Sequence, residues 1–263
     1  MYAFEYQRAK SVADAAAALA KSGGKALAGG QSLVGAMKLR LANPGTLVDL
    51  SGIAELKGIK KEGDAIVIGA LTTHAEVASS PIVKQAIPAL ARLAEDIGDR
   101  QVRNRGTLGG SIANNDPAAD YPAAVLGLGA TVQTNKRKIA ADDFFKGMYE
   151  TALADDEIIT AVSFPIPKKA AYMKFPQPAS RFALVGVFVA QTGGGVRVAV
   201  TGAASHVHRA SAIESALSKS FTPDAAKAVK IPADHLNSDI HGSAAYRAHL
   251  VAVMASRAVA AAG

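Results

Sequence analysis

Hydrophobic and polar positions alternate between helical and extended patterns over the first fifty residues. Ser11 followed by Asp14 is typical of a helix N-terminus, and the helix that it predicts ends at a glycine pair. Apolar runs at 25–29 and 46–50 predict two short strands, and their short links favour a small parallel sheet. Between the strands, one face of a further predicted helix over 32–42 carries four apolar residues: Leu33, Val34, Met37 and Leu41.

Residues 53–170 follow a different pattern, typical of an α+β unit with a largely antiparallel sheet. Short apolar runs predict strands at 65–72, 130–134, 138–141 and 158–164. Helical spacing predicts helices over 80–98 and 117–129.

A cluster of prolines in FPIPKKAAYMKFPQP predicts a domain boundary near residue 170. The chain therefore divides into residues 1–170, with subdomains of about 1–52 and 53–170, and residues 171–263. In the second part, FALVGVFVAQTGGGVRVAVTGA predicts a hairpin around TGGG, and the rest is mainly helical.

Composition narrows the chemistry. The 263 residues contain no cysteine, which excludes disulfides, thiolate zinc sites and iron–sulfur ligation by this chain. The net charge of +7 is spread along the sequence, and aromatic residues make up only 5%, so a nucleic-acid surface is not expected. No apolar run is long enough for a transmembrane helix and no signal core follows the start, so we expect a cytoplasmic protein.

Two glycine pairs are the strongest chemical feature. LAGGQS contains Gly29 and Gly30, and RGTLGGS contains Gly109 and Gly110 between hydroxyl residues. Glycines allow successive backbone N–H groups to turn toward an anion, so two such loops can grip one pyrophosphate from opposite sides. Tight turns in an α+β fold explain the same pairs equally well. Neither the dinucleotide fingerprint nor the P-loop is present, and GQSLVG misses the hydrolase elbow by one position.

The stretches AGGQSLVGAMKLRLANPGTLVDL and IGDRQVRNRGTLGGSIANNDPAADYPAAVLGLGA resemble the two flavin motifs of molybdenum hydroxylase medium subunits. Aerobic carbon monoxide dehydrogenase medium subunits are the nearest resemblance, and the xanthine dehydrogenase FAD domain is a more distant one. The resemblance covers nearly the whole chain. It implies a vanillyl-alcohol-oxidase-type (PCMH-type) FAD-binding domain of two α/β subdomains, followed by a small C-terminal sheet-and-helix domain.

The resemblance also implies a set of FAD-binding positions and no catalytic or metal-binding residue. They are Ala28, Gly29, Gly30, Gln31, Ser32, Ile97, Thr107, Gly109, Gly110, Ser111, Asp120, Ile159, Lys174 and Phe182. Asn114 joins them. Together with Asn115 and Asp116, it either bonds the backbone of a turn or lines the flavin pocket with its amide. Two positions depart from carbon monoxide dehydrogenases, which have histidine at Gln31 and tyrosine at Phe182. Both changes weaken carbon monoxide as the expected substrate.

The implied function is electron transfer by a flavoprotein oxidoreductase subunit. Partners would be a large molybdopterin subunit and a small subunit with two-iron, two-sulfur clusters, in a dimer of heterotrimers that is cytoplasmic or peripheral at the inner face of the membrane. Electrons would pass through FAD to a quinone, NAD or oxygen. The alternatives are a stand-alone FAD-dependent oxidase or dehydrogenase of a small alcohol or sugar, and a scaffold without flavin.

Other polar clusters have ordinary structural explanations. His206 and His208 would share one strand face as a metal pair, but no third ligand stands nearby in sequence. Asp142 and Asp143 form an acid pair at a helix start, where carboxylates suit the helix dipole. NKRK at 135–138 is typical of a solvated hairpin tip.

Overall fold

A small parallel sheet forms at the N-terminal end of the chain. In the computed structural model, which describes residues 1–263, the strand order is β1 (Glu5–Arg8), β3 (Thr46–Asp49), β2 (Lys25–Leu27). Helix α1 (Val12–Ser22) packs against this sheet, with the Ser11 hydroxyl accepting from the Asp14 N–H. The predicted strand–helix–strand unit is confirmed, while β1, whose side chains are all exposed, was not predicted.

The next helix is shorter than its apolar spacing suggested. Helix α2 covers Leu33–Lys38, and Arg40 then adopts a φ of 60°, which ends helical geometry. Met37 is buried as expected, but Leu41 is 79% exposed. The placement of Leu41 on the apolar face of the helix was therefore wrong, because the backbone leaves helical geometry at Arg40, before Leu41.

The middle of the chain forms the predicted antiparallel layer. Its order is β4 (Ile59–Glu62), β5 (Ala65–Gly69), β10 (Ile159–Pro165), β6 (Thr131–Thr134), β7 (Lys138–Ala140). A separate hairpin pairs β8 (Phe145–Gly147) with β9 (Glu150–Thr151). The NKRK segment lies at the exposed β6–β7 turn, as expected.

Short helices surround this sheet. The predicted helix over 80–98 is divided at Pro88, which has no N–H to continue the ladder. The helices of this region, with one 3-10 turn at Ala54–Leu56, are α3 (His74–Ser79), α4 (Pro81–Ala86), α5 (Pro88–Glu95), α6 (Arg100–Arg105), α7 (Leu108–Asn114), α8 (Tyr121–Leu128) and α9 (Ala141–Phe144).

A third, antiparallel sheet begins at Lys169. Its order is β11 (Lys169–Pro176), β12 (Ala183–Thr192), β13 (Gly195–Thr201), β14 (His208–Arg209), and the β12–β13 turn is the predicted TGGG hairpin. The helices α10 (Ser211–Lys219), α11 (Pro223–Lys227) and α12 (Ala244–Ala261) pack on one face of it. The mainly helical tail is thus confirmed.

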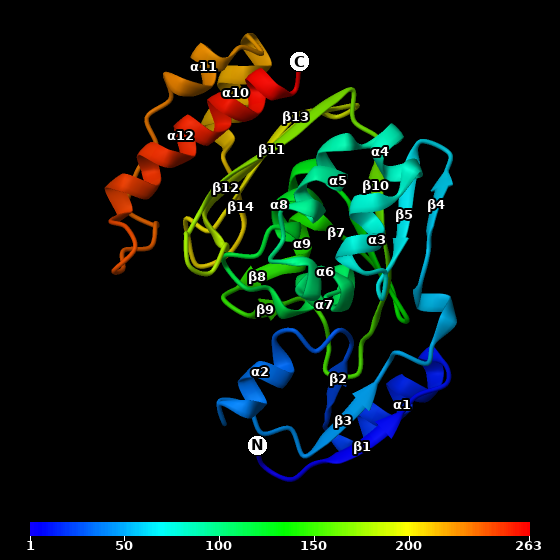
Figure 1. Ribbon diagram of the computed structural model, residues 1–263. Helices are drawn as coiled ribbons and strands as arrows, with labels where there is room; N and C mark the ends of the chain where they lie inside the picture. Colours follow the sequence, from blue (N-terminus) through cyan, green and yellow to red (C-terminus); the bar gives the residue numbers. More distant parts are fainter.

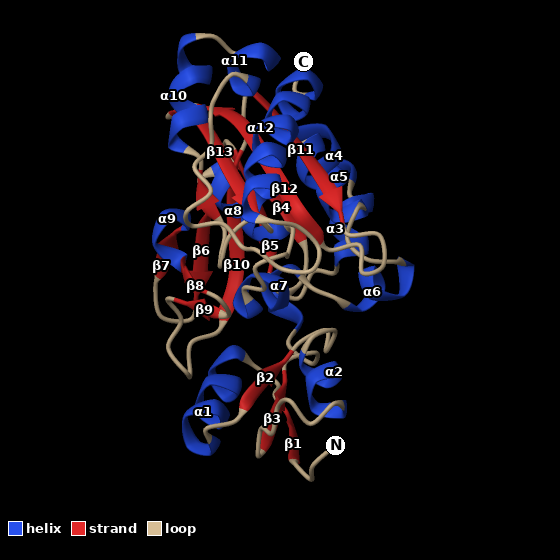
Figure 2. Ribbon diagram, turned by 90° about the vertical axis from the view of Figure 1, so that its left-hand side faces the viewer, coloured by secondary structure: helices blue, strands red, loops and turns tan.

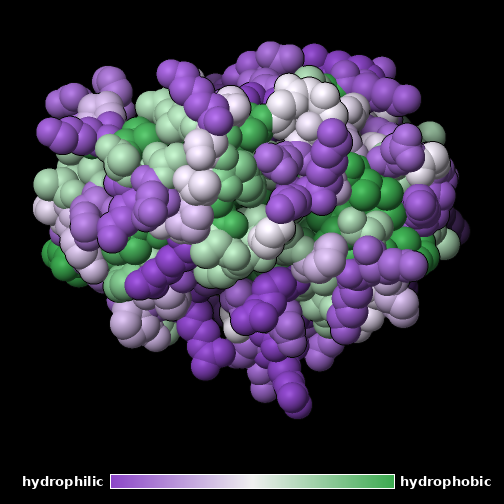
Figure 3. Space-filling model, turned by 90° about the horizontal axis from the view of Figure 1, so that it is seen from above, coloured by the Kyte–Doolittle hydropathy of each residue, from purple (hydrophilic) through white to green (hydrophobic).

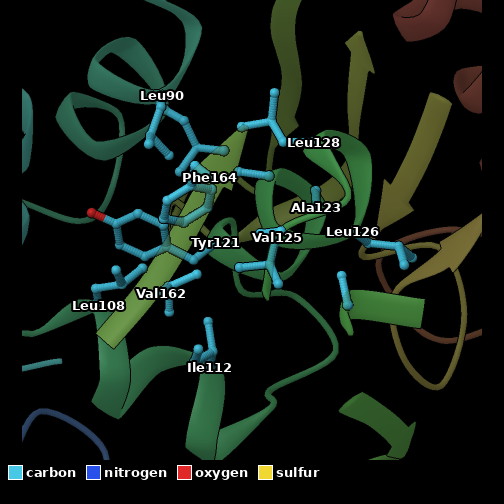
Figure 4. Packing of buried hydrophobic residues seen from close by; sticks show 14 of the residues in the cluster. Leu90, Leu108, Ile112, Tyr121, Ala123, Val125, Leu126, Leu128, Val162 and Phe164 are labelled. Atoms are coloured by element: carbon cyan, nitrogen blue, oxygen red, sulfur yellow. The ribbon is translucent and has the colours of Figure 1, made fainter. Parts of the chain in front are cut away.

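Helix α8 lies between the middle and third sheets and is buried along its whole length. Its Tyr121 ring packs among Leu90, Leu108 and Phe164 in the largest apolar cluster (Figure 4). The N-terminal unit, by contrast, lies below the main body in Figure 1, with its own small core. The two views agree that α7 and the end of β2 face each other across this junction (Figures 1 and 2).

The outer surface is mixed. Seen from above in Figure 3, hydrophilic side chains surround and interrupt the apolar patches. None of the helices combines the length and apolar character needed to cross a bilayer.

Candidate functional site

Two glycine-containing loops, far apart in sequence, meet at the junction between the N-terminal unit and the main body. The first loop, residues 28–32, follows β2, and the second loop, residues 107–111, begins α7. The backbone at Gly29 lies so close to Arg105 that a Cβ there would be 2.0 Å from the Arg105 carbonyl oxygen. A Cβ on Gly110 would lie 3.6 Å from the Ala28 Cβ. The structure therefore brings the predicted loops together, and glycine permits the close approach.

The first loop presents unpaired backbone donors. None of the N–H groups from Ala28 to Ser32 donates a hydrogen bond within the chain. Gly30 has a φ of 74°, a left-handed conformation that favours glycine. Gln31 and Ser32 are exposed, and neither side chain is engaged in a hydrogen bond. This run of N–H groups has the property that an anion nest requires.

The second loop differs, and here the expectation of a second nest of inward N–H groups was wrong. The Leu108 and Gly109 N–H groups donate to the carbonyls of Thr72 and Ala70, at 3.1 and 2.8 Å. The Gly110 N–H donates to the Thr107 hydroxyl and the Ser111 N–H to the Thr107 carbonyl. The first two bonds anchor the start of α7 to the segment that follows β5, and the other two form the N-terminal cap of α7, so these donors are already used.

What the second loop offers instead is a pair of hydroxyls. Thr107 accepts from Gly110 but keeps its own O–H to donate, and the partly buried Ser111 hydroxyl has no partner in the chain. The Thr107 N–H is also unpaired. The junction therefore presents unpaired backbone donors on the first loop and free hydroxyls on the second.

The two asparagines after the second loop have separate roles. Asn115 is fully buried at a φ of 44°, and its side-chain amide donates to the carbonyls of Gly147 and Glu150, both at 2.8 Å. Asn115 thus bonds the backbone of the β8–β9 hairpin, while in the local turn the Asp116 carboxylate accepts from the Ala118 N–H at 2.9 Å. Asn114 is partly buried with an uncommitted amide, which remains able to contact a ligand.

Beyond the second loop, a buried ion pair joins two predicted site residues. Asp120 precedes α8, and its carboxylate lies 3.1 Å from the Lys174 ammonium of β11. The two side chains are only 5% and 7% exposed. Burial raises the pKa of Asp120 above its ordinary value, while Lys174 and a Tyr172 hydrogen bond act in the opposite direction.

The predicted apolar positions fall into two groups. Ile97 is partly buried and Phe182 is 48% exposed, on a turn whose Gln177 N–H donates to the Phe182 carbonyl. Ile159 instead lies in the large apolar core, where a register shift interrupts β10. Its neighbour Ile158 belongs to the small N-terminal core, against which Ala28 also packs. The structure therefore does not bring Ile159 to the surface of the loops.

Sequence reasoning missed two residues next to this site. The Tyr172 hydroxyl donates to Asp120 at 2.5 Å. Its spacing of two from Lys174 on a strand was an available signal, because alternate residues share a face. His74 is buried against the second loop, where a Cβ on Gly106 would lie 2.5 Å from its Nε2. Burial, helped by Arg103, lowers its pKa to about 4, so it is neutral at physiological pH.

Comparison with known proteins identifies the family of this chain and the cofactor of that family. Residues 2–167 match the family of FAD-binding domains in molybdopterin dehydrogenases. The chain belongs to this family. It is a flavoprotein subunit of an oxidoreductase, and its cofactor is FAD.

Relatives of this FAD-binding subunit match along nearly its whole length. The carbon monoxide dehydrogenase medium chain of Hydrogenophaga pseudoflava is 38% identical over 97% of this chain and 96% of its own. The nicotine 6-hydroxylase medium subunit of Paenarthrobacter nicotinovorans is 37% identical over 99% of this chain and 98% of its own. A solved structure of carbon monoxide dehydrogenase from Hydrogenophaga pseudoflava, 39% identical, superposes with a TM-score of 0.90 over 99% of this chain and 97% of that one.

The residues of the junction fit FAD on grounds that the structure supplies. Unpaired N–H groups of the first loop suit a pyrophosphate, which is an anion with many acceptor oxygens. The second loop adds free hydroxyl donors, and the turn between β11 and β12 carries the exposed Phe182 ring, which is an aromatic surface suited to stacking. The mixed α/β architecture is that of the family's FAD-binding domain.

The other polar clusters have local structural partners. Asp142 pairs with Arg197 and Arg209, and these contacts lower the pKa of its carboxyl against the effect of burial. His206 is partly buried beside the Ser205 hydroxyl, and the His208 ring faces the His206 carbonyl.

Proposed function

We propose that this chain is the medium subunit of a molybdenum hydroxylase complex and relays electrons from a partner to an external acceptor. Its partners would be a large molybdopterin subunit and a small subunit with two-iron, two-sulfur clusters, in a dimer of heterotrimers. The chain's lack of cysteine and its full-length similarity to medium chains support this division of labour. The acceptor would be a quinone, NAD or oxygen.

The observation that carries the proposal is the run of unpaired N–H groups in the first loop, directly opposite the second loop. Ala28 to Ser32 would hold the FAD pyrophosphate from one side. From the other side, Thr107 and Ser111 would donate hydroxyl hydrogen bonds, while Gly109 and Gly110 allow α7 to approach. When bound, FAD supplies the redox chemistry, and this chain binds and orients it.

The remaining predicted positions would surround the other parts of the cofactor. Asp120 and Lys174 would supply a fixed carboxylate and ammonium, Asn114 an amide, and Ile97 and Phe182 apolar contact with the flavin ring. Ile159 would act from within the core beneath the site. The binding unit would be a vanillyl-alcohol-oxidase-type (PCMH-type) domain over residues 1–170, with subdomains of about 1–52 and 53–170. Residues 171–263 would form the C-terminal domain.

The two relatives are named for different substrates, carbon monoxide and nicotine, although each matches this chain along nearly its whole length. We therefore expect another chain of the complex to determine the substrate. The decisive experiment purifies the complex through a tag on this chain and records its visible spectrum during anaerobic addition of candidate substrates. Iron–sulfur and flavin bands that bleach together support the relay. A flavin that bleaches with a small alcohol or sugar in the isolated chain would contradict it and favour a stand-alone oxidase.

A further inference from the structure

Asp120 is held by two side chains from a single strand. The Tyr172 hydroxyl donates to its Oδ1 at 2.5 Å, and the Lys174 ammonium lies 3.1 Å from Oδ1 and 3.2 Å from Oδ2. Tyr172 and Lys174 occupy alternate positions of β11 and so point to the same face. All three side chains are nine-tenths or more buried.

The neighbouring strand is shaped to let Tyr172 reach Asp120. Gly186 of β12 lies opposite Lys174, and a Cβ on it would be 2.3 Å from the Tyr172 hydroxyl oxygen. The same Cβ would lie 2.9 Å from the Thr201 Cγ2. Only glycine leaves the space through which the phenol passes.

The ammonium has a further anchor on the middle of the chain. Lys174 donates to the Asp96 carbonyl at 2.9 Å, just after α5. A groove of about 990 Å³ runs past this point, and its lining includes Gly98, Gln177 and Arg181. Lys174 thus links the start of α8 to the groove wall, at a position fixed by Asp120.

We propose that Tyr172 is a positioning residue of the flavin site, which fixes the Asp120 carboxylate and through it the Lys174 ammonium, with Gly186 providing the clearance. This rests on the proposed function, because Asp120 and Lys174 are the groups that would face the cofactor. Without the hydroxyl, the carboxylate keeps only Lys174 as a partner and both groups gain rotational freedom. A hydrogen bond to a charged group is strong enough that FAD affinity should fall about tenfold.

The charged and titratable groups facing Asp120 are Lys174 and Tyr172 from β11, Asp96 after α5, and Tyr121 of α8. Burial raises the pKa of Asp120, and the Tyr172 hydrogen bond opposes that rise. Removing the hydroxyl therefore raises the pKa further. As pH falls, the Asp120 carboxylate is then protonated at a higher pH in the variant than in the wild type.

The test measures the FAD dissociation constant by flavin fluorescence from about pH 5 to about pH 8. Tyr172→Phe keeps the ring and removes only the hydroxyl, and Gly186→Ala displaces the intact phenol. Tyr246→Phe on α12, where the ring is 41% exposed, is the matched control. We expect Tyr172→Phe to weaken binding about tenfold and to shift the acid loss of affinity to higher pH, while Tyr246→Phe behaves like the wild type.

The double variant that combines Tyr172→Phe with Gly186→Ala provides a second readout. Because the phenyl ring of this variant has no hydroxyl for the new Cβ to meet, the combined loss should be smaller than the product of the two single losses. An unchanged affinity in Tyr172→Phe, or a loss of equal size at every pH, would overturn the positioning role while leaving the proposed function intact. Failure of the wild type itself to bind FAD would overturn both.

Discussion

Gly110 is the position where a small change tests the shared grip of the two loops. A Cβ there would lie 2.8 Å from the Thr107 Oγ1 and 3.6 Å from the Ala28 Cβ. Alanine therefore pushes against the hydroxyl that caps α7, and valine also fills the space toward the first loop. Gly35 on α2 is the matched control, because a Cβ there meets nothing within 4 Å.

The expected magnitudes follow from these contacts. Loss of the Thr107 cap costs about 1 kcal/mol of stability, which lowers the melting temperature by about 3 °C in a chain of this size. A hydrogen bond to a charged phosphate is worth about 1.5–3 kcal/mol, so each one lost weakens FAD about ten- to hundredfold. Gly110→Ala should lose about tenfold and Gly110→Val about a hundredfold or more.

The assay is a titration of each purified variant with FAD, accompanied by a circular dichroism melt of the flavin-free chain. The melt establishes that the variants are folded, so that a lost affinity reports on the site. Gly35→Ala should bind like the wild type. Wild-type affinity in a folded Gly110→Val variant would refute the assignment of the second loop.

Three further predictions concern the supports of the site. Glu157, whose pKa Arg137 and other partners lower to about 2 from 4.5, contributes stability that is present above pH 4.5 and lost as pH falls toward 2. Glu157→Gln should therefore cost about 2 kcal/mol at pH 7, allowing for the exposure of Arg137, and much less at pH 2, as measured by chemical denaturation. The pKa of His74 is lowered to about 4 from 6.5, so on acidification the unfolded chain takes up this proton first, and stability falls by about 3 kcal/mol between pH 6.5 and 4. His74→Gln should flatten the dependence of stability on pH over this range, and an unchanged slope would show that His74 does not cause it. Gly109→Ala should destabilise the flavin-free chain by about 2 kcal/mol or more, because its Cβ would be 2.8 Å from the Ala70 carbonyl oxygen, and a melt like that of the wild type would disprove this tight packing.

Much of the architecture was predictable because it depends on local patterns. Ser11 marked the start of α1, and alternating apolar runs marked the strands of the middle sheet. The placement of Leu41 on the apolar face of a helix was wrong, because helical spacing does not reveal where the backbone leaves helical geometry. It does so at Arg40. Strand β1 could not be predicted because its side chains are all exposed, and its sequence therefore shows no alternation of apolar and polar residues.

The site was predictable as a pair of loops but not in its hydrogen bonding. Both glycine pairs look alike in sequence, yet the N–H of Gly109 is used by Ala70 whereas that of Gly29 is free. Such a difference depends on the segment just after β5, which is remote in sequence from α7. His74 could not be predicted for the same reason, since its burial against a distant segment leaves no mark on its neighbours in sequence. Tyr172 did leave a signal, because it lies two residues before Lys174 on a strand and so shares its face.

Titrating the purified chain with FAD and with riboflavin tests whether the loops hold the pyrophosphate. Riboflavin has the same ring but lacks the pyrophosphate that the loops are proposed to hold. The account predicts one FAD bound per chain and riboflavin affinity weaker by about a hundredfold or more, since several charge-assisted hydrogen bonds are lost. Equal affinities for the two flavins, or no binding of FAD at all, would contradict it.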